Sequence, residues 1–422
     1  MDIFRIEGPV RLNGQVSVRG SKNAALPIMS ACILAAGTST ISAVPNLSDI
    51  AVSAELLTSV GCKIEKTGDG VLQIDATTID NPFGDYEIVR RMRASICFLG
   101  PLLARCGRVE ISMPGGCAIG DGPIDIHLRG LRQLGAKIKL ENGYIVAEAP
   151  NGLRGNQIFL GGPFGSTVLG TANVLSAATI AKGTTVIESA ACEPEISDLA
   201  VFLSKMGAKI TGIGSPRLTI EGVKELHPAQ HTVIPDRIEA GTFMVAAAIT
   251  GGQIEIRNCR LDDMMAVIDK LRDIDVTVEP ADGGCVVNQK GTLRPVEITT
   301  QPYPGFPTDL QAQFMALLSL ADGNSIIIEK VFPDRFMHVA ELNRMAANLH
   351  KEGSVVIVAG TKKLMGAPVM ASDLRASAAL VLAGLAAEGT TIVSRVYHID
   401  RGYEKIEQRL QSLGAKIYRE KE

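Results

Sequence analysis

The 422-residue chain contains no tryptophan, and only 4% of its residues are aromatic, whereas 43 are glycine. This composition predicts many tight turns and closely packed aliphatic helices. The chain also lacks a large excess of positive or negative charge. Its 42 lysine and arginine residues nearly balance its 45 aspartate and glutamate residues, and the formal net charge is −3. Without a general basic surface, nucleic acid is not expected as a partner.

Metal-ligand and membrane patterns are missing as well. The eight cysteines show neither CxxC nor Cys/His spacing, so we expect no metal, no cofactor and no disulfide framework. The longest apolar stretches, residues 24–37 and 376–387, are too short to span a bilayer. The first seven residues carry charge where a signal peptide needs an apolar run. These features predict a cytoplasmic protein that does not associate with membranes.

An internal repeat organises the chain. The element Leu134-Gly135-Ala136-Lys137-Ile138 recurs with variations whose second positions are 68 to 74 residues apart. Clean and degraded copies lie at residues 60–64, 134–138, 206–210, 274–278, 345–349 and 413–417. A second marker, a glycine between an apolar helix and a strand, recurs at positions 37, 107, 183, 252, 323 and 389. The two markers predict six α/β repeats, three in each of two domains.

Each repeat also contains a segment that is apolar on every side and is therefore expected as a buried helix. These segments are 24–35, 94–104, 168–181, 240–250, 310–320 and 376–387. Their first turns carry polar or charged residues: Lys22-Asn23, Arg93, Ser166-Thr167, Asp236-Arg237, Thr308-Asp309 and Arg375. Helix amino termini attract anions, so these ends predict a site for phosphorylated or carboxylated ligands. Ordinary helix caps are the alternative.

Several motifs, in order, resemble the UDP-N-acetylglucosamine 1-carboxyvinyltransferase family. They are Ser21-Lys22-Asn23-Ala24, Met92-Arg93-Ala94-Ser95, Pro114-Gly115-Gly116-Cys117, Phe306-Pro307-Thr308-Asp309, Arg335-Phe336-Met337-His338, Asp373-Leu374-Arg375 and His398-Ile399-Asp400-Arg401-Gly402-Tyr403. The resemblance implies an inside-out α/β barrel pair, with one domain at 22–233 and the other formed by 1–21 plus 234–422. It places the active site in the interdomain cleft.

The resemblance implies transfer of the enolpyruvyl group of phosphoenolpyruvate to the 3-hydroxyl of UDP-N-acetylglucosamine, with release of phosphate. This reaction is the first committed step of peptidoglycan biosynthesis. Cys117 matches the proton donor, which forms a phosphoenolpyruvate adduct and is alkylated by fosfomycin. Asp309 matches the residue that binds the sugar 3-hydroxyl and takes its proton. Lys22 and Arg401 match cations that hold phosphoenolpyruvate, with Arg335 and Arg375 alongside.

The remaining matched positions concern the sugar nucleotide. Asn23 and Arg93 correspond to substrate contacts, Asp125 to the uracil contact and Val331 to a backbone-side nucleotide contact. Pro123, Ile124 and Ile126 flank Asp125 and are included with it.

Two segments depart from the family pattern. Gly122 stands where the family usually has an arginine, and Pro163 and Phe164 alter the segment 160–167, where the family has a phosphate-binding run. The departures leave two alternatives open: an enolpyruvyl transferase with a different nucleotide or sugar acceptor, and a poorly active substrate-binding paralogue.

Overall fold

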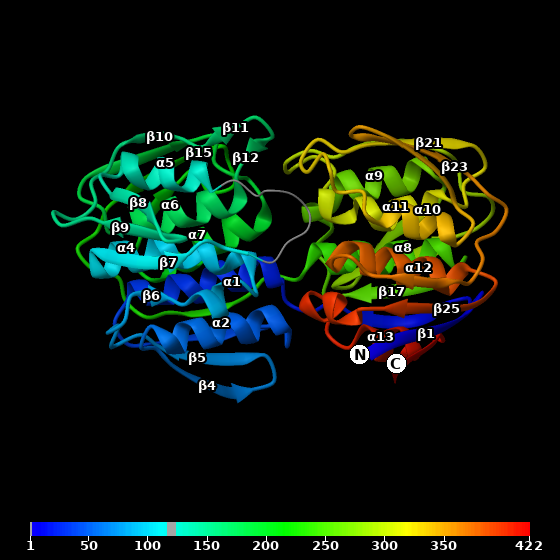
Figure 1. Ribbon diagram of the computed structural model, residues 1–422, viewed down its shortest axis with the longest axis horizontal. Coiled ribbons are helices and arrows are strands. Elements are labelled where there is room, and N and C mark those ends of the chain that lie inside the picture. The colour runs from blue at the N-terminus through cyan, green and yellow to red at the C-terminus, as the bar shows by residue number, and fades with distance from the viewer. Residues whose placement is uncertain (1, 116–123) are drawn as a thin grey trace. The chain divides into compact units, whose positions relative to one another are not determined.

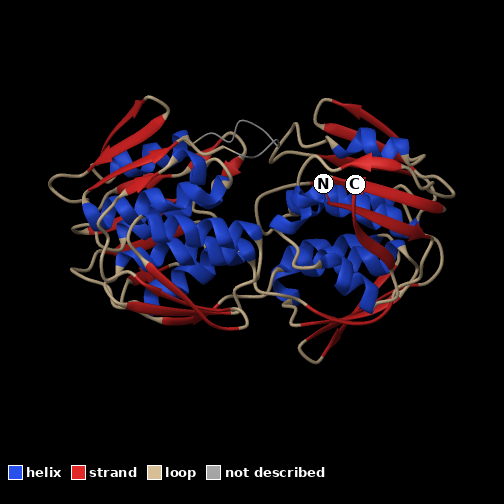
Figure 2. Cartoon of the chain, turned by 60° about the horizontal axis from the view of Figure 1, so that its bottom comes forward, coloured by secondary structure: helices blue, strands red, loops and turns tan. Residues whose placement is uncertain are grey.

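The computed structural model describes residues 2–115 and 124–422. They form two compact units (Figure 1): residues 2–19 with 235–422 make up unit 1, and residues 20–115 with 124–234 make up unit 2. Within each unit the helices lie inside and the strands lie outside, as Figure 2 shows. In the part of the chain described, none of the helices has the length and apolar character needed to cross a bilayer.

The six apolar segments form buried helices, three in each unit, and several of them open or close with a turn of 3-10 helix. In unit 2 they are α1 (Lys22–Ala31) with η1 (Cys32–Leu34), η2 (Arg93–Phe98) with α4 (Leu99–Cys106), and α6 (Val168–Ala178). In unit 1 they are α8 (Arg237–Ile249), η4 (Thr308–Leu310) with α10 (Gln311–Leu318), and α12 (Leu374–Ala386).

Small residues let these helices approach closely. A Cβ atom added to Gly100 of α4 would lie 2.3 Å from the carbonyl oxygen of Asn173 in α6, so the two backbones are in direct contact. The alanines of α12 are buried to the same degree as its leucines. The close packing that the composition predicts therefore holds in both units.

A second set of helices is half-buried, with one face toward the core. They are α2 (Ser48–Ser59), α5 (Asp125–Gln133), α7 (Pro194–Lys205), α9 (Met265–Asp273), α11 (His338–Arg344) and α13 (Ile406–Ser412). The described residues also include the short α3 (Tyr86–Val89), η3 (Leu261–Met264) and η5 (Val396–Arg401).

The four-stranded sheets of the described residues share one strand order: an edge strand that pairs in parallel, the second strand, and then two strands that pair antiparallel. In unit 2 the sheets are β16 (Gln230–Thr232), β3 (Thr38–Ser42), β5 (Val71–Asp75), β4 (Lys63–Gly68); β6 (Phe83–Gly84), β7 (Arg108–Ser112), β9 (Tyr144–Glu148), β8 (Lys137–Glu141); and β10 (Gln157–Phe159), β13 (Thr184–Glu188), β15 (Arg217–Glu221), β14 (Lys209–Thr211). In unit 1 they are β2 (Asn13–Ser17), β17 (Gln253–Arg257), β19 (Gly284–Gln289), β18 (Val276–Ala281); β20 (Glu297–Thr299), β21 (Asn324–Ile328), β23 (Val355–Ala359), β22 (Asn348–Glu352); and β24 (Pro368–Met370), β25 (Gly389–Ser394), β1 (Asp2–Gly8), β26 (Lys416–Lys421). A two-stranded hairpin, β11 (Gly161–Gly162) and β12 (Gly165–Ser166), is separate.

The chain closes each unit on itself by exchanging end segments between repeats. In unit 1, β1 pairs antiparallel with β25 and β26, while β2 adds in parallel to β17. In unit 2, β16 comes from the end of the third repeat and adds in parallel to β3 of the first. The result is a mixed α/β fold with helices enclosed by sheets, which confirms the predicted fold class.

The first sequence marker corresponds to one backbone conformation. Its second residue has a positive φ in every repeat: 112° at Gly61, 97° at Gly135, 102° at Gly207, 65° at Asp275, 63° at Ala346 and 100° at Gly414. The two degraded copies keep the left-handed turn without glycine, which costs a residue with a Cβ about 1–2 kcal/mol. The turn, rather than the residue, is therefore what the repeat preserves.

This predicts opposite effects of two exchanges. Gly135→Ala should destabilise the protein by about 1–2 kcal/mol although no atom lies within 4 Å of the new Cβ, whereas Ala346→Gly should be neutral or stabilise by up to about 1 kcal/mol. Urea unfolding of the two variants beside the wild type measures both effects. A neutral Gly135→Ala would show that the left-handed turn does not explain the glycine.

Candidate active site

Three of the predicted residues of unit 1 meet at one carboxylate. Asp309, in η4, accepts a hydrogen bond from Nη1 of Arg335 at 2.8 Å through Oδ1, and another from Nη2 of Arg375 at 2.7 Å through Oδ2. Burial by itself raises the pKa of the Asp309 carboxyl, but the guanidinium groups of Arg375 and Arg335 outweigh it and hold that pKa well below its usual range. Asp309 is therefore an ionised carboxylate between two cations.

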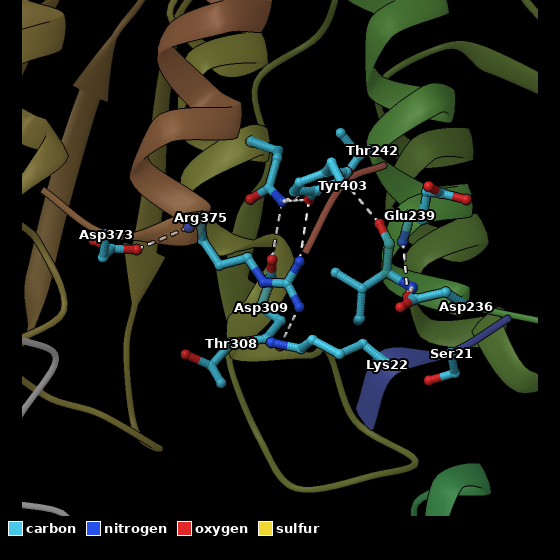
Figure 3. A network of polar contacts seen from close by, with 12 residues as sticks. Ser21, Lys22, Asp236, Glu239, Thr242, Thr308, Asp309, Asp373, Arg375 and Tyr403 are labelled. Atoms are coloured by element: carbon cyan, nitrogen blue, oxygen red, sulfur yellow. Dashed lines mark hydrogen bonds and ion pairs between the residues drawn. The ribbon is translucent and has the colours of Figure 1, made fainter. Parts of the chain in front are cut away.

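Arg375 is held from its other side by Tyr403, which the sequence analysis quoted in a motif without giving it a role. Figure 3 shows the guanidinium between the Tyr403 ring and Asp309, and Nη1 donates to the Tyr403 hydroxyl at 3.2 Å. The proton of the Thr242 hydroxyl goes to the carbonyl of Ile238, so the Tyr403 hydroxyl donates to Thr242 over their 2.8 Å contact. Gln313 donates to both hydroxyl oxygens at 3.3 Å. A fully buried polar network thus fixes Arg375.

Arg335 is held through a second buried acid that the sequence analysis missed. Glu329 is 0% exposed and accepts hydrogen bonds from the backbone N–H of Val331 and from the hydroxyl of Thr308, both at 2.8 Å. Thr308 in turn accepts from Nη1 of Arg335 at 3.2 Å. Glu329 therefore connects the predicted nucleotide contact at Val331 with the segment that carries Asp309. A charged residue directly after the apolar strand β21 was the signal that could have revealed it.

The remaining predicted residue of unit 1, Arg401, ends η5 and lies two positions before Tyr403 in the chain.

Arg375 belongs to the first turn of α12, where the side chain of Asp373 accepts the backbone N–H groups of Arg375 and Ala376 at 2.8 and 3.1 Å. Asp373 thus caps the helix through the backbone, while the guanidinium of Arg375 donates to Asp309.

In unit 2, Lys22 is the first residue of α1, and Asn23 is the second. The Lys22 ammonium is buried and lies 3.1 Å from Oδ2 of Asp49 in α2. Ser21 caps the helix by accepting the N–H of Ala24. A cation at the beginning of a helix opposes the helix dipole, so Asp49 compensates a position that helix formation alone does not favour.

Asn173, a polar residue within the apolar helix α6, joins two elements of unit 2 that begin at predicted residues. Its amide donates to the carbonyl of Ile96 at 2.8 Å and to Nδ1 of His127 at 3.0 Å, and its oxygen accepts the N–H of Gly100 at 2.7 Å. These contacts tie η2, which begins at Arg93, to α5, which begins at Asp125.

Asp125 is exposed at the start of α5, Ile126 is buried, and Ile124 is the residue that precedes the helix. Cys117, Pro123 and Gly122 lie outside the described residues. In the altered segment, Gly161–Gly162 and Gly165–Ser166 form the β11–β12 hairpin, with Phe164 half-exposed in the turn between them. Within residues 2–115 and 124–422, no group of three or more His, Cys, Asp or Glu side chains is arranged to hold a metal ion.

Solved structures with the same architecture define the class of protein. The enolpyruvyl transferase NikO from Streptomyces tendae is 25% identical, covers 99% of this chain and 98% of its own, and superimposes with a TM-score of 0.89. EPSP synthase from Acinetobacter baumannii, 19% identical over the full length of both chains, gives a TM-score of 0.75. The fold is that of the enolpyruvyl transferases.

Sequence comparison narrows this class. The family model for EPSP synthase (3-phosphoshikimate 1-carboxyvinyltransferase) matches residues 6–410. UDP-N-acetylglucosamine 1-carboxyvinyltransferases from Trichlorobacter lovleyi and Methylacidiphilum infernorum are 55% and 53% identical, each covering 99% of both chains. The chain belongs to the UDP-N-acetylglucosamine 1-carboxyvinyltransferase family of enolpyruvyl transferases, and the resemblance seen in the sequence is confirmed.

The polar contacts of Asn173 predict a pH dependence of stability. The Asn173 amide donates to Nδ1 of His127, so the buried imidazole is neutral, and burial, with a smaller contribution from Arg93, lowers its pKa to about 4. In the unfolded chain the pKa returns to about 6.5. Because the unfolded state binds the proton first, stability is lost as the pH falls from 6.5 toward 4, by about 2–3 kcal/mol at pH 4.5.

Urea unfolding at pH 7 and pH 4.5 tests this prediction when wild type is compared with His127→Gln, which cannot bind the proton. The variant should lose about 2–3 kcal/mol less than the wild type between the two pH values. Equal losses would mean that His127 is not held neutral in the folded protein.

Proposed function

We propose that this protein transfers the enolpyruvyl group of phosphoenolpyruvate to the 3-hydroxyl of UDP-N-acetylglucosamine in the cytoplasm, releasing phosphate in the first committed step of peptidoglycan synthesis. The observation that carries the proposal is the ionised Asp309 between the buried guanidinium groups of Arg335 and Arg375. A carboxylate can take a proton from a hydroxyl, and cations beside it can hold an anionic donor. The full-length relatives named for this activity support the same reaction.

The chemistry is an addition followed by an elimination. C3 of the enol gains a proton, and the sugar hydroxyl attacks C2 as it loses its own proton. Phosphate then leaves C2 while C3 gives up a proton, which restores the carbon–carbon double bond. We assign the first proton to Cys117 and the second to Asp309. Lys22 and Arg401, with Arg335 and Arg375, would neutralise the carboxylate and phosphate of the donor.

For the acceptor, we assign Asn23 and Arg93 to the sugar and diphosphate side, and Asp125 with its neighbours Pro123, Ile124 and Ile126 to the uridine. Val331 would contribute a backbone contact, in a segment that Glu329 holds in place. Asn173 ties η2 to α5 through Ile96 and His127, and this tie would help to position Arg93 and Asp125 at the beginnings of the two elements.

A second candidate is enolpyruvyl transfer to a different nucleotide or sugar acceptor. The β11–β12 hairpin favours it, because Pro163 offers no N–H to a phosphate and Phe164 is bulky. Gly122 in place of an arginine points the same way, and it would also suit a substrate-binding paralogue with low turnover.

Phosphate release from phosphoenolpyruvate tests the proposed reaction. We expect release by wild type to depend on UDP-N-acetylglucosamine. Gly122→Arg should raise kcat/KM about 30-fold or more, since a bidentate cation would be restored near two anionic substrates. Gly68→Arg is a matched control, because Gly68 is an exposed glycine at the end of β4 whose φ is not positive, and an added Cβ would meet only the Val71 side chain, at 3.6 Å.

The outcomes separate the candidates. Release with another sugar nucleotide, and none with UDP-N-acetylglucosamine, would replace the first candidate by the second. Binding of both substrates without release, in wild type and Gly122→Arg alike, would favour the low-turnover paralogue.

Fosfomycin gives an independent test of Cys117. Incubation with the drug and UDP-N-acetylglucosamine should add one fosfomycin to the protein, on the peptide that contains Cys117, as intact-mass and peptide mass spectrometry would show. Cys117→Asp should escape alkylation and keep activity, because a carboxylic acid can also donate a proton. Labelling of Cys106 or Cys192, the partly exposed cysteines among those described, would contradict the assignment.

A further inference from the structure

Asp309 is more exposed to solvent than the two arginines that it pairs with. Its side chain is 25% exposed, whereas those of Arg335 and Arg375 are 7% and 4% exposed. The carboxylate is therefore the member of the cluster that solvent reaches most easily.

Both guanidinium groups have supports that do not involve Asp309. The hydroxyl of Tyr403 holds Arg375, and the hydroxyl of Thr308, itself anchored on the buried Glu329, holds Arg335. Removing the Asp309 carboxylate would thus leave the two cations anchored. Such a prearranged pair of guanidiniums is a good receptor for a carboxylate or a phosphate.

Arg375 also has hydrogen-bonding capacity in reserve. Its Nε is buried and makes no hydrogen bond among the described residues, although a buried guanidinium N–H without a partner is costly. Asp309 uses only Nη2, and Tyr403 only Nη1. A ligand oxygen could therefore gain a contact on Arg375 that Asp309 does not make.

We propose that Asp309 occupies the place of a substrate anion on Arg335 and Arg375, and that the anionic group of the donor displaces it when the donor binds. The inference rests on the proposed function for the identity of the donor, phosphoenolpyruvate. One anion replaces another on the same two guanidiniums, so neither cation is left without a partner after the exchange.

The exchange also prepares Asp309 for its chemical role. While the arginines hold it, its pKa is too far below the usual range for effective proton abstraction. Once the donor takes the arginines, the pKa of the Asp309 carboxyl rises toward its ordinary value. The released carboxylate is then the stronger base, and it is released only when the donor is present.

Binding of anions to Asp309→Asn is the experiment that tests this exchange. The variant keeps the shape of the side chain but removes the competing charge, so inorganic phosphate and phosphoenolpyruvate should bind about tenfold more tightly than to wild type, as titration calorimetry would measure. Asp373→Asn is the matched control: it removes one carboxylate from the same cluster, asparagine caps a helix as well as aspartate does, and Asp373 caps the helix through backbone N–H groups. Its affinity for phosphate should change less than about twofold.

The exchange is wrong if Asp309→Asn binds phosphate as tightly as wild type or more weakly. It is also wrong if Asp373→Asn gains as much affinity for phosphate as Asp309→Asn, because general electrostatics would then explain the gain. If Asp309→Asn does not fold, amide hydrogen exchange of wild type decides: exchange at Thr308–Leu310 should accelerate on adding phosphate, and unchanged or slower exchange contradicts the proposal. Acceptor-dependent phosphate release by wild type plays no part in these measurements. Tighter anion binding without any turnover would therefore keep the exchange and reject the proposed reaction.

Discussion

The burial of six helices that are apolar on every side is the constraint on which the architecture depends. Such helices have no face to offer to water, so sheets must enclose them, three in each unit. The charged side chains of these helices lie at the helix ends. Lys22 and Arg93 in unit 2, and Asp309 and Arg375 in unit 1, all belong to first turns of these helices. Charged groups at the helix ends of each unit therefore follow from the way in which its core is covered.

A guanidinium group at the edge of such a core loses its hydration, and the surrounding polar residues must compensate for that loss. A buried arginine needs an anion and oriented acceptors, and Asp309, Tyr403 and Thr308 supply them. Some polar atoms in this region still lack a hydrogen bond. Among the described residues, Nε of Arg375 and the side-chain oxygens of Gln311 and Gln313 are buried without a partner. Unsatisfied groups that gather beside a paired carboxylate suit a site completed by a ligand better than a purely structural cluster.

The sequence was sufficient for features that depend on local pattern. The repeat period, the buried helices and the polar first turns could all be predicted, because each is written in neighbouring residues. The hydrogen bonds of Glu329, Tyr403 and Asn173 could not. Thr242 and Tyr403 are 161 positions apart, and Asp309 and Arg375 are 66 apart, so only the folded chain brings them together. The motifs also do not reveal that Asp309 pairs with Arg335 and Arg375, the two arginines that were predicted to bind the substrate.

The pairing of Asp309 with the two arginines bears on how donor binding can control acid–base chemistry. A carboxylate beside two guanidiniums is a weak base, and the same carboxylate without them is a stronger one. If the donor's anion takes over the arginines, Asp309 becomes more basic because it loses two neighbouring cations, and the supports at Tyr403 and Thr308 keep the two guanidinium groups in place. Asp309 then takes the proton of the acceptor hydroxyl readily only when the donor, which that hydroxyl attacks, is bound. Donor binding and base strength would thus be linked through one shared pair of cations.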